Sequence, residues 1–162
     1  MTKLYRFNEN KKIMFYCEAW IENNSILEHV GQVGTKGRLI THSLNPSLAL
    51  NDNIEFILSA ARRGGYKEIP ANKHFILVVE IKSSSDLNLD LSKRNLEEKY
   101  LNEKLGWLGL GCCDGGSIGS GTMEIFCPVV DFSIAENLLQ KEYSQGDRCM
   151  INRIYCLNPR VD

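Results

Sequence analysis

Basic side chains near glycines and near a predicted helix end are the residues of this 162-residue chain best suited to chemistry. That chemistry is the binding of phosphate groups, because Lys and Arg neutralise phosphates and nearby backbone N–H groups can add hydrogen bonds. The alternative is that the same side chains form a solvated face and complement the dipole of the helix end. The candidates are Lys11, Lys12, Lys36, Arg38, Arg62, Arg63 and Lys67.

Two of these candidates belong to the stretch from Val30 to Arg38, Val-Gly-Gln-Val-Gly-Thr-Lys-Gly-Arg, which carries three glycines in seven residues. Glycine supplies backbone conformations that other residues adopt only with strain, so this spacing predicts an irregular turn between two strands. Tyr16 and Trp20 could stack on a base, although each is more often simply a core residue.

A second candidate site is the run from Asp114 to Gly121, Asp-Gly-Gly-Ser-Ile-Gly-Ser-Gly. Asp114, Ser117 and Ser120 could contact a cation or an anion through their side-chain oxygens. The run is not a dinucleotide-binding motif, because that motif leads from a strand into a helix and here a strand follows. The other explanation is that the glycines let a long, bulged hairpin twist and pack closely.

No catalytic residue, metal site or cofactor is predicted. His29 and His42 could pair across neighbouring strands, but no carboxylate or nucleophile accompanies them at an informative spacing. The cysteines do not form the two Cys-x-x-Cys pairs typical of a zinc site, and we expect buried, reduced thiols. Cys112 and Cys113 are adjacent, so on a strand they point to opposite faces. The six cysteines are Cys17, Cys112, Cys113, Cys127, Cys149 and Cys156.

The composition is typical of a soluble globular protein, with 43% hydrophobic and 24% charged residues. No stretch approaches the roughly 18 apolar residues of a membrane helix, and the first residues do not resemble a signal peptide. We therefore expect a cytoplasmic protein with no membrane partner. Residues 1–74 hold ten Lys/Arg and seven Asp/Glu, a net charge of +3, whereas residues 75–162 hold nine and thirteen, a net charge of −4. This asymmetry suits different partners, although a difference of this size also arises by chance.

The first half predicts four strands followed by one helix. Alternating apolar residues indicate strands over 3–7, 13–21, 26–33 and 38–44, and the polar run 22–25 indicates a hairpin turn. Ser47 or Asn51 could cap a helix from Leu48 to Arg63. Its apolar face would comprise Ile54, Ile57, Leu58 and Ala61.

From about Lys3 to Glu68 the chain resembles the WGR domain, a small antiparallel sheet with a helix found in poly(ADP-ribose) polymerases and many bacterial proteins. The resemblance depends on Gly31, the run Gly34-Thr35-Lys36-Gly37, the helix, and Gly65-Tyr66. The chain departs from the family where the motif has Trp and Arg, because Val30 and Gln32 stand there. The family's Trp and Arg take part in nucleic-acid or interdomain contacts, so the resemblance implies a binding role that these two positions do not carry.

The second half, residues 75–162, follows a short linker at 70–73 and predicts the order β-α-β-β-α-β. Strands are expected over 75–82, 107–113, 122–130 and 149–156. Asp90 or Ser92 would open the first helix, which runs to Leu105 with Leu96, Tyr100, Leu101 and Leu105 facing inward. Ser133 and Glu136 form a capping box for the second helix, which runs to Tyr143. This order is the ferredoxin-like arrangement, so the chain is expected to be α+β with two domains, 1–70 and 75–162.

Three classes of function remain open on these observations. The first is a non-catalytic bacterial-type binding protein whose WGR-like half contacts nucleic acid or a nucleic-acid-associated protein. Its contacts would be Lys12, Lys36, Arg38, Arg62, Arg63 and Lys67. The second is a protein-binding immunity protein that neutralises a bacterial toxin, in which an acidic surface would cover a basic nuclease site. The third, an enzyme, has no supporting nucleophile–base pair or cofactor-binding motif.

Overall fold

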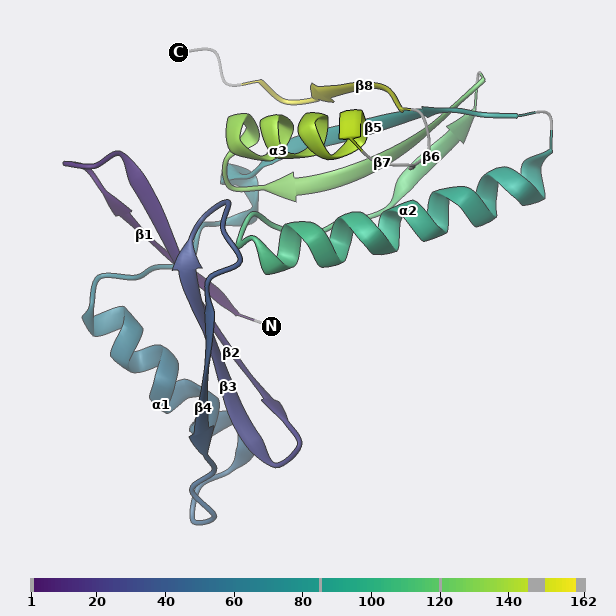
Figure 1. The fold of residues 1–162 in the computed structure, drawn as a ribbon. Helices are drawn as coiled ribbons and strands as arrows, with labels where there is room; N and C mark the ends of the chain where they lie inside the picture. The colour runs from purple at the N-terminus through teal and green to yellow at the C-terminus, as the bar shows by residue number, and fades with distance from the viewer. Residues whose placement is uncertain (1, 85, 120, 146–150, 160–162) are drawn as a thin grey trace. The chain divides into compact units, whose positions relative to one another are not determined.

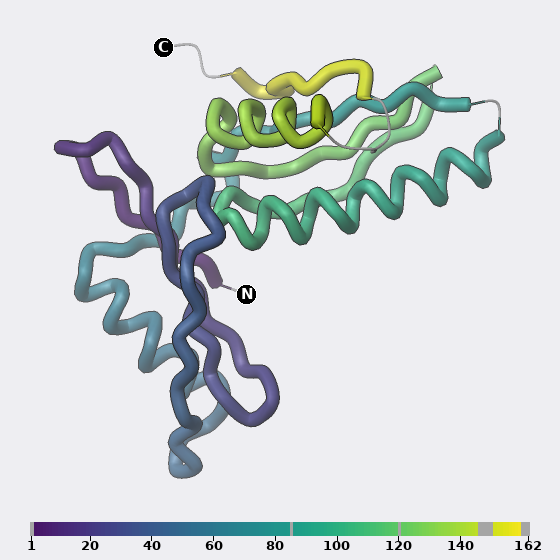
Figure 2. Tube along the Cα trace, in the orientation of Figure 1, coloured from purple at the N-terminus to yellow at the C-terminus, as the bar shows by residue number. Residues whose placement is uncertain are grey.

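The computed structural model describes residues 2–84, 86–119, 121–145 and 151–159. The chain divides into two compact units, Met1–Pro70 and Ala71–Asp162. Each unit contains a four-stranded antiparallel sheet (Figures 1 and 2). The predicted α+β class is therefore confirmed, with one helix on the first sheet and a β-α-β-β-α-β order in the second unit.

The sheet of the first unit is a meander in which strands adjacent in sequence are also adjacent in space. Asn23 and Asn24 connect the second and third strands with φ angles of 47° and 60°. Asparagine tolerates this left-handed region, and two such residues make the tight turn that suits twisted hairpins. The strands are β1 (Lys3–Asn8), β2 (Ile13–Glu22), β3 (Ser25–Gln32) and β4 (Arg38–Ser43).

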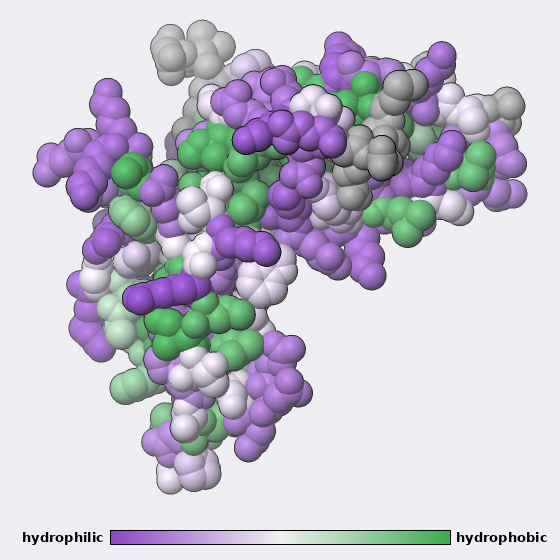
Figure 3. Space-filling model, viewed as in Figure 1, coloured by the Kyte–Doolittle hydropathy of each residue, from purple (hydrophilic) through white to green (hydrophobic). Residues whose placement is uncertain are grey.

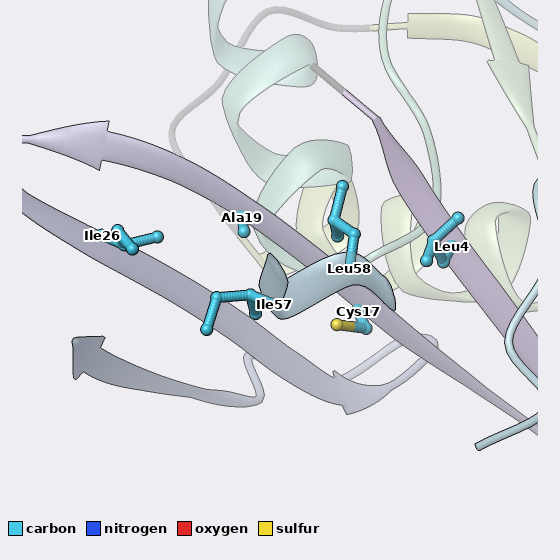
Figure 4. Close-up of a cluster of buried hydrophobic side chains, with 6 residues drawn as sticks. All are labelled: Leu4, Cys17, Ala19, Ile26, Ile57 and Leu58. Carbon is cyan, nitrogen blue, oxygen red and sulfur yellow. The ribbon is translucent and has the colours of Figure 1, made fainter. Parts of the chain in front are cut away.

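Helix α1 (Leu50–Arg63) covers one face of this sheet (Figure 1). Figure 4 shows the apolar cluster that joins them, in which the helix contributes Ile57 and Leu58. The strands contribute Leu4, Cys17, Ala19 and Ile26. Burial, followed by the charge of Glu28, raises the pKa of the Cys17 thiol to about 12, so this cysteine behaves as a small apolar core residue.

The start of α1 differs from the prediction, because neither Ser47 nor Asn51 caps the helix. Ala49 occupies the capping position and has no polar side chain. Instead the buried amide of Asn53 donates to the carbonyl of Ala49 (3.0 Å) and accepts from the backbone N–H of Asn45 (2.8 Å). A carboxamide carries both donors and an acceptor, so one side chain inside the helix can hold the preceding turn.

The sheet of the second unit has the strand order β6-β7-β5-β8, which is that of the ferredoxin-like arrangement. A single turn of 3₁₀-helix (Ala71–Lys73) precedes it. The strands are β5 (Phe75–Lys82), β6 (Gly116–Gly119), β7 (Thr122–Val129) and β8 (Ile151–Cys156). The predicted limits of β5 are confirmed.

Helices α2 (Leu87–Trp107) and α3 (Phe132–Gln145) lie side by side and are joined by polar side chains. Tyr100 donates to Glu142 and Tyr143 donates to Glu97, each over 2.6 Å between oxygens. Apolar residues of both helices and of β5 and β7 are fully buried and form the core of this unit. They include Leu77, Val79, Leu101, Leu105, Ile125, Cys127 and Leu139.

Helix α2 begins earlier than predicted, and of its predicted inward face Leu101 and Leu105 are fully buried whereas Leu96 is not. Asp86 caps it by accepting from the backbone N–H groups of Asn88 (3.0 Å) and Leu89 (3.1 Å). Asp90, predicted to open the helix, is buried within its first turn and accepts from the N–H of Ser84 instead. Leu96 is 72% exposed, because the seam with α3 is made by polar residues such as Glu97 rather than by a continuous apolar stripe.

Two further boundaries are corrected. The predicted strand 107–113 is absent from the described residues, since α2 continues to Trp107 and only Gly111 makes an isolated bridge, to Val129. The strand that pairs with β7 on the side away from β5 is β6, inside the glycine-rich run. The capping position of α3 is Asp131, whose side chain accepts from the N–H of Ile134 (2.9 Å), so the helix begins before the predicted Ser133.

The start of the last predicted strand at Cys149 lies outside the described residues, and β8 is described from Ile151. None of the helices in the described part of the chain combines the length and apolarity needed to cross a membrane. Figure 3 shows that hydrophilic side chains dominate the surface along α2, with hydrophobic groups emerging among them.

Candidate binding site at the glycine turn

The segment from Val33 to Gly37, called the glycine turn below, connects β3 to β4 and is fixed by backbone hydrogen bonds. The N–H of Val33 donates to the carbonyl of Met14 (2.9 Å), and the N–H of Thr35 donates to that of Gln32 (3.0 Å). Gly34 and Gly37 have φ angles of 88° and 62°, which favour glycine. The irregular turn predicted from the glycine spacing is therefore present.

Two buried side chains support the glycine turn from beneath. Tyr16 donates its hydroxyl hydrogen to the carbonyl of Thr35, with 3.1 Å between oxygens. The Nε2 atom of His29 lies 2.6 Å from the carbonyl oxygen of Lys36. Tyr16 is fully buried and His29 is 1% exposed, so the side chains that make these bonds are shielded from water although the turn itself is exposed. Burial, followed by the charge of Glu18, raises the pKa of Tyr16, which keeps its hydroxyl neutral and able to donate.

A buried carboxylate completes this support. The Nδ1 atom of His29 lies 2.9 Å from Oε1 of Glu18, and Lys3 Nζ lies 3.2 Å from the same oxygen. Glu18 is 3% exposed, and a charge this deeply buried requires partners. Both ring nitrogens of His29 thus face oxygen acceptors, Glu18 on one side and the carbonyl of Lys36 on the other. We call Tyr16, Glu18 and His29 the buried triad.

The expected pairing between His29 and His42 is wrong. In the register of β3 and β4, His29 lies opposite Leu39 and His42 lies opposite Ile26. The two imidazoles therefore point to opposite faces of the sheet. Each has its own carboxylate instead, and that of His42 is Glu28, 2.7 Å away.

Three of the predicted contacts lie on turns at one end of the first sheet or next to them. Lys36 and Arg38 are exposed, the first in the glycine turn and the second at the start of β4. Lys12 is exposed in the turn between β1 and β2, with a φ of 51°. The bond between Val33 and Met14 ties the glycine turn to the beginning of β2, two residues after Lys12.

The other predicted contacts lie around the end of α1. Arg62 is paired with Glu55 and, at 3.5 Å, with Glu68, so its charge is partly compensated. Arg63 is exposed in the last turn of the helix. Lys67 is exposed, and its backbone exchanges two hydrogen bonds with Tyr5 at 2.7 and 2.8 Å.

One residue of this region was missed by the sequence analysis. Arg6 places its guanidinium 4.9 Å from the ring centre of Tyr66 and 5.6 Å from that of Phe15, and it donates to the carbonyl of Gly64 (3.2 Å). Arginine stacks on aromatic faces while its N–H groups keep their directions. The sequence signal is weak, because Tyr66 reaches Arg6 only when the chain returns along β1 after the helix.

Of the three contacts predicted in the second glycine-rich run, the structure describes Asp114 and Ser117. Ser117 donates its hydroxyl to Glu124 (2.8 Å), and Glu124 also accepts from Tyr155 (2.6 Å). Asp114 is exposed, and its backbone N–H bonds to Phe126. Ser120 lies outside the described residues. In the part of the chain that the structure describes, no three His, Cys, Asp or Glu residues gather as a metal site would require.

The fold and this geometry define a class: an α+β protein of two units in which a buried polar triad supports an exposed basic turn. No protein-family model, curated protein or solved structure matches the chain. The WGR resemblance therefore depends on the residues named above, and the function remains a proposal.

Proposed function

We propose that the chain is a non-catalytic binding protein whose first unit contacts nucleic acid or a nucleic-acid-associated protein through the glycine turn. The observation that carries the proposal is the support of this turn by Tyr16 and His29, which leaves Lys36 and Arg38 exposed above it. A turn whose shape is set before binding loses little conformational freedom when a ligand arrives.

Phosphate is the ligand group that this surface fits best. A lysine ammonium binds a phosphate as a point charge, whereas an arginine guanidinium binds it with two parallel N–H groups. Lys12 would extend the contact along the same end of the sheet, and Arg63 with Lys67 would extend it at the helix end. Arg6, stacked between Phe15 and Tyr66, adds a guanidinium in a restrained orientation.

The test is a titration of labelled single-stranded, nicked and duplex nucleic acid, followed by fluorescence anisotropy at low and physiological salt. We expect micromolar or tighter binding that weakens as salt rises, because counterions are released on binding. The double variant Lys36→Glu/Arg38→Glu should weaken binding to all sequences and flatten the plot of log K against log salt by about two units.

The matched control is Lys93→Glu/Lys99→Glu, which makes the same change of net charge on exposed positions of α2. It should leave the binding curve close to that of the parent protein. If salt-sensitive binding is absent at micromolar protein, nucleic acid is not the ligand. If binding occurs but both double variants weaken it equally, the glycine turn is not the contact surface.

The alternative is an immunity protein that binds a basic bacterial toxin, and exposed leucines on α2 are the observation in its favour. Leu89 and Leu96 are 47% and 72% exposed, in the half of the chain that carries a net charge of −4. The product of the adjacent gene would then be the toxin. Co-expression of this protein with it should restore the growth of cells that the toxin inhibits, and the two proteins should purify as a complex. Leu96→Glu should abolish protection, and Leu157→Glu, at another exposed apolar position, should not.

A further inference from the structure

Two cysteine sulfurs in the second unit are in direct contact. Sγ of Cys113 lies 3.0 Å from Sγ of Cys127. Cys127 is fully buried in β7, whereas Cys113 is half-buried in the segment that follows α2. Neither the glycine turn nor the proposed nucleic-acid contact uses this pair.

The backbone places these two cysteines directly opposite each other. On one side of the pair, the N–H of Asp114 donates to the carbonyl of Phe126 (2.8 Å), and on the other, the N–H of Cys112 donates to that of Pro128 (3.3 Å). Cys113 and Cys127 therefore occupy a non-hydrogen-bonded position of an antiparallel pair, where Cα atoms are about 4.5 Å apart. That separation is at the short end of the range that a disulfide spans, about 4.4–6.8 Å.

The other described cysteines are not placed to compete for Cys127. Cys112 is adjacent to Cys113, so it points to the opposite side of an extended segment. Cys156 on β8 and Cys127 on β7 both pair with Leu77, which stands between them in the sheet. Cys17 belongs to the core of the first unit.

We propose that Cys113 and Cys127 form a reversible cross-strand disulfide when the protein is exposed to hydrogen peroxide. The sulfur of Cys113 attacks one peroxide oxygen, the O–O bond breaks, and the products are a sulfenic acid and one water. The sulfur of Cys127 then displaces the hydroxyl group from Cys113, and its thiol proton leaves with that group as a second water. Both sulfurs are oxidised and both peroxide oxygens are reduced.

The order of these steps follows from the surroundings of the two thiols. The hydrogen bond with Cys113 and burial raise the pKa of the Cys127 thiol, and the thiolate is the nucleophilic form. The more accessible Cys113 is therefore the site of first oxidation. The resulting disulfide would close a ring from residue 113 to 127. It would join β7 covalently to the segment that precedes β6, at the end of the β6–β7 hairpin away from its turn. A cross-link with this strand geometry is expected to be readily reversed by a small dithiol.

The test treats the full-length protein with a small excess of hydrogen peroxide and then counts free thiols after unfolding. We expect two of the six thiols to be lost and the intact protein to become two hydrogen atoms lighter. Peptide mapping without reduction should recover Cys113 joined to Cys127, and dithiothreitol should restore both thiols. Cys127→Ser should instead stop at a Cys113 sulfenic acid that dimedone labels.

Controls separate this pair from the other cysteines. Cys112→Ser and Cys156→Ser should form the cross-link at the parent rate. Cys113→Ser, at a half-buried position, should lose the cross-link even if Cys127→Ser fails to fold. The proposal is overturned if Cys113 proceeds to sulfinic acid while Cys127 stays a thiol. It is equally overturned if the recovered cross-link joins any other cysteines or two copies of the chain.

Discussion

The two glycine-rich segments of this protein are supported in different ways. The glycine turn of the first unit bonds to buried side chains, the hydroxyl of Tyr16 and the imidazole of His29. The segment before and within β6 instead bonds to the backbone of β7, where the N–H of Phe126 donates to the carbonyl of Gly115 (3.0 Å). One segment depends on side-chain chemistry, and the other on strand pairing.

The glycines themselves reflect this difference. At Gly37 the backbone has a φ of 62°, and an added Cβ would meet the Tyr16 hydroxyl and the carbonyl of Val30. At Gly116 an added Cβ would overlap the backbone carbonyl of Glu124. The first glycine thus accommodates a side chain beneath it as well as the backbone of β3, whereas the second lies against the backbone of β7. Single side-chain substitutions should therefore disturb the glycine turn far more than the second segment.

The largest expected effect comes from removing the imidazole of the buried triad. His29→Leu removes the closer of the two partners that the structure describes for Glu18, which is 3% exposed, and leaves Lys3 beside this carboxylate. Removing a hydrogen-bonding partner from a buried, charged group costs about 3 kcal/mol or more, so the free energy of unfolding in a denaturant titration should fall by at least that amount.

His42→Leu is the matched control for this loss. His42 and its partner Glu28 are 33% and 18% exposed, so solvent screens their interaction. The expected cost of His42→Leu is about 1 kcal/mol or less. Equal losses of unfolding free energy for the two variants would mean that burial does not determine how much the triad contributes to stability.

The next effect tests the glycines. Gly37→Ala forces a Cβ into a left-handed backbone and against Tyr16. We expect a loss of about 3 kcal/mol, from the sum of conformational strain and overpacking. An added Cβ at Gly119 would meet no atom within 4 Å, so Gly119→Ala should change the free energy of unfolding by about 0.5 kcal/mol or less. Thermal unfolding of both variants tests whether close packing explains why residue 37 is a glycine.

Most of the fold could be predicted, because strands with one buried face show an alternation of apolar and polar residues in the sequence. The end of α1 at Arg63 was predicted, but the helix starts were not, since Asn53 holds the chain before α1 from inside the helix and Asp86 is one of several neighbouring polar residues that could cap α2. The inward face of α2 was also mispredicted at Leu96. Leu101 and Leu105 are buried as predicted, but the seam with α3 is made by Tyr100 and Glu97, so hydropathy marks the buried side only in part.

The candidate site was predictable only in part. The glycine spacing located the turn and its exposed Lys36 and Arg38. The buried triad could not be derived, because His29 meets Glu18 only through the register of β2 and β3. Arg6 was missed for the same reason, since its ring partner Tyr66 follows the helix. A register between distant segments leaves no local pattern in the sequence.

A smaller effect links the triad to the proposed function. Tyr16→Phe removes one hydroxyl beneath the glycine turn, and we expect a loss of about 1–2 kcal/mol in stability. Nucleic-acid affinity should also fall, because the turn is no longer held in one shape. Tyr143→Phe removes a comparable, partly buried hydroxyl bond in the second unit, to Glu97. It should cost similar stability and leave affinity unchanged, so equal affinity losses would contradict a role for the turn.

The smallest expected effect concerns Glu80 and Arg153, the ion pair of the second unit that we compare with Glu18 and its partners in the first. Arg153 bonds to Glu80 at 2.8 and 3.0 Å but is 62% exposed. These hydrogen bonds lower the pKa of Glu80. A carboxyl with a lowered folded-state pKa stabilises the fold above its unfolded pKa, and that contribution disappears as the pH falls through the folded value. Arg153→Gln should raise the Glu80 midpoint in an NMR titration of its carboxyl carbon, whereas Arg153→Lys should raise it less. An unchanged midpoint in Arg153→Gln would mean that neighbouring groups other than the guanidinium hold the carboxylate, and that the two units do not differ in how they stabilise charge.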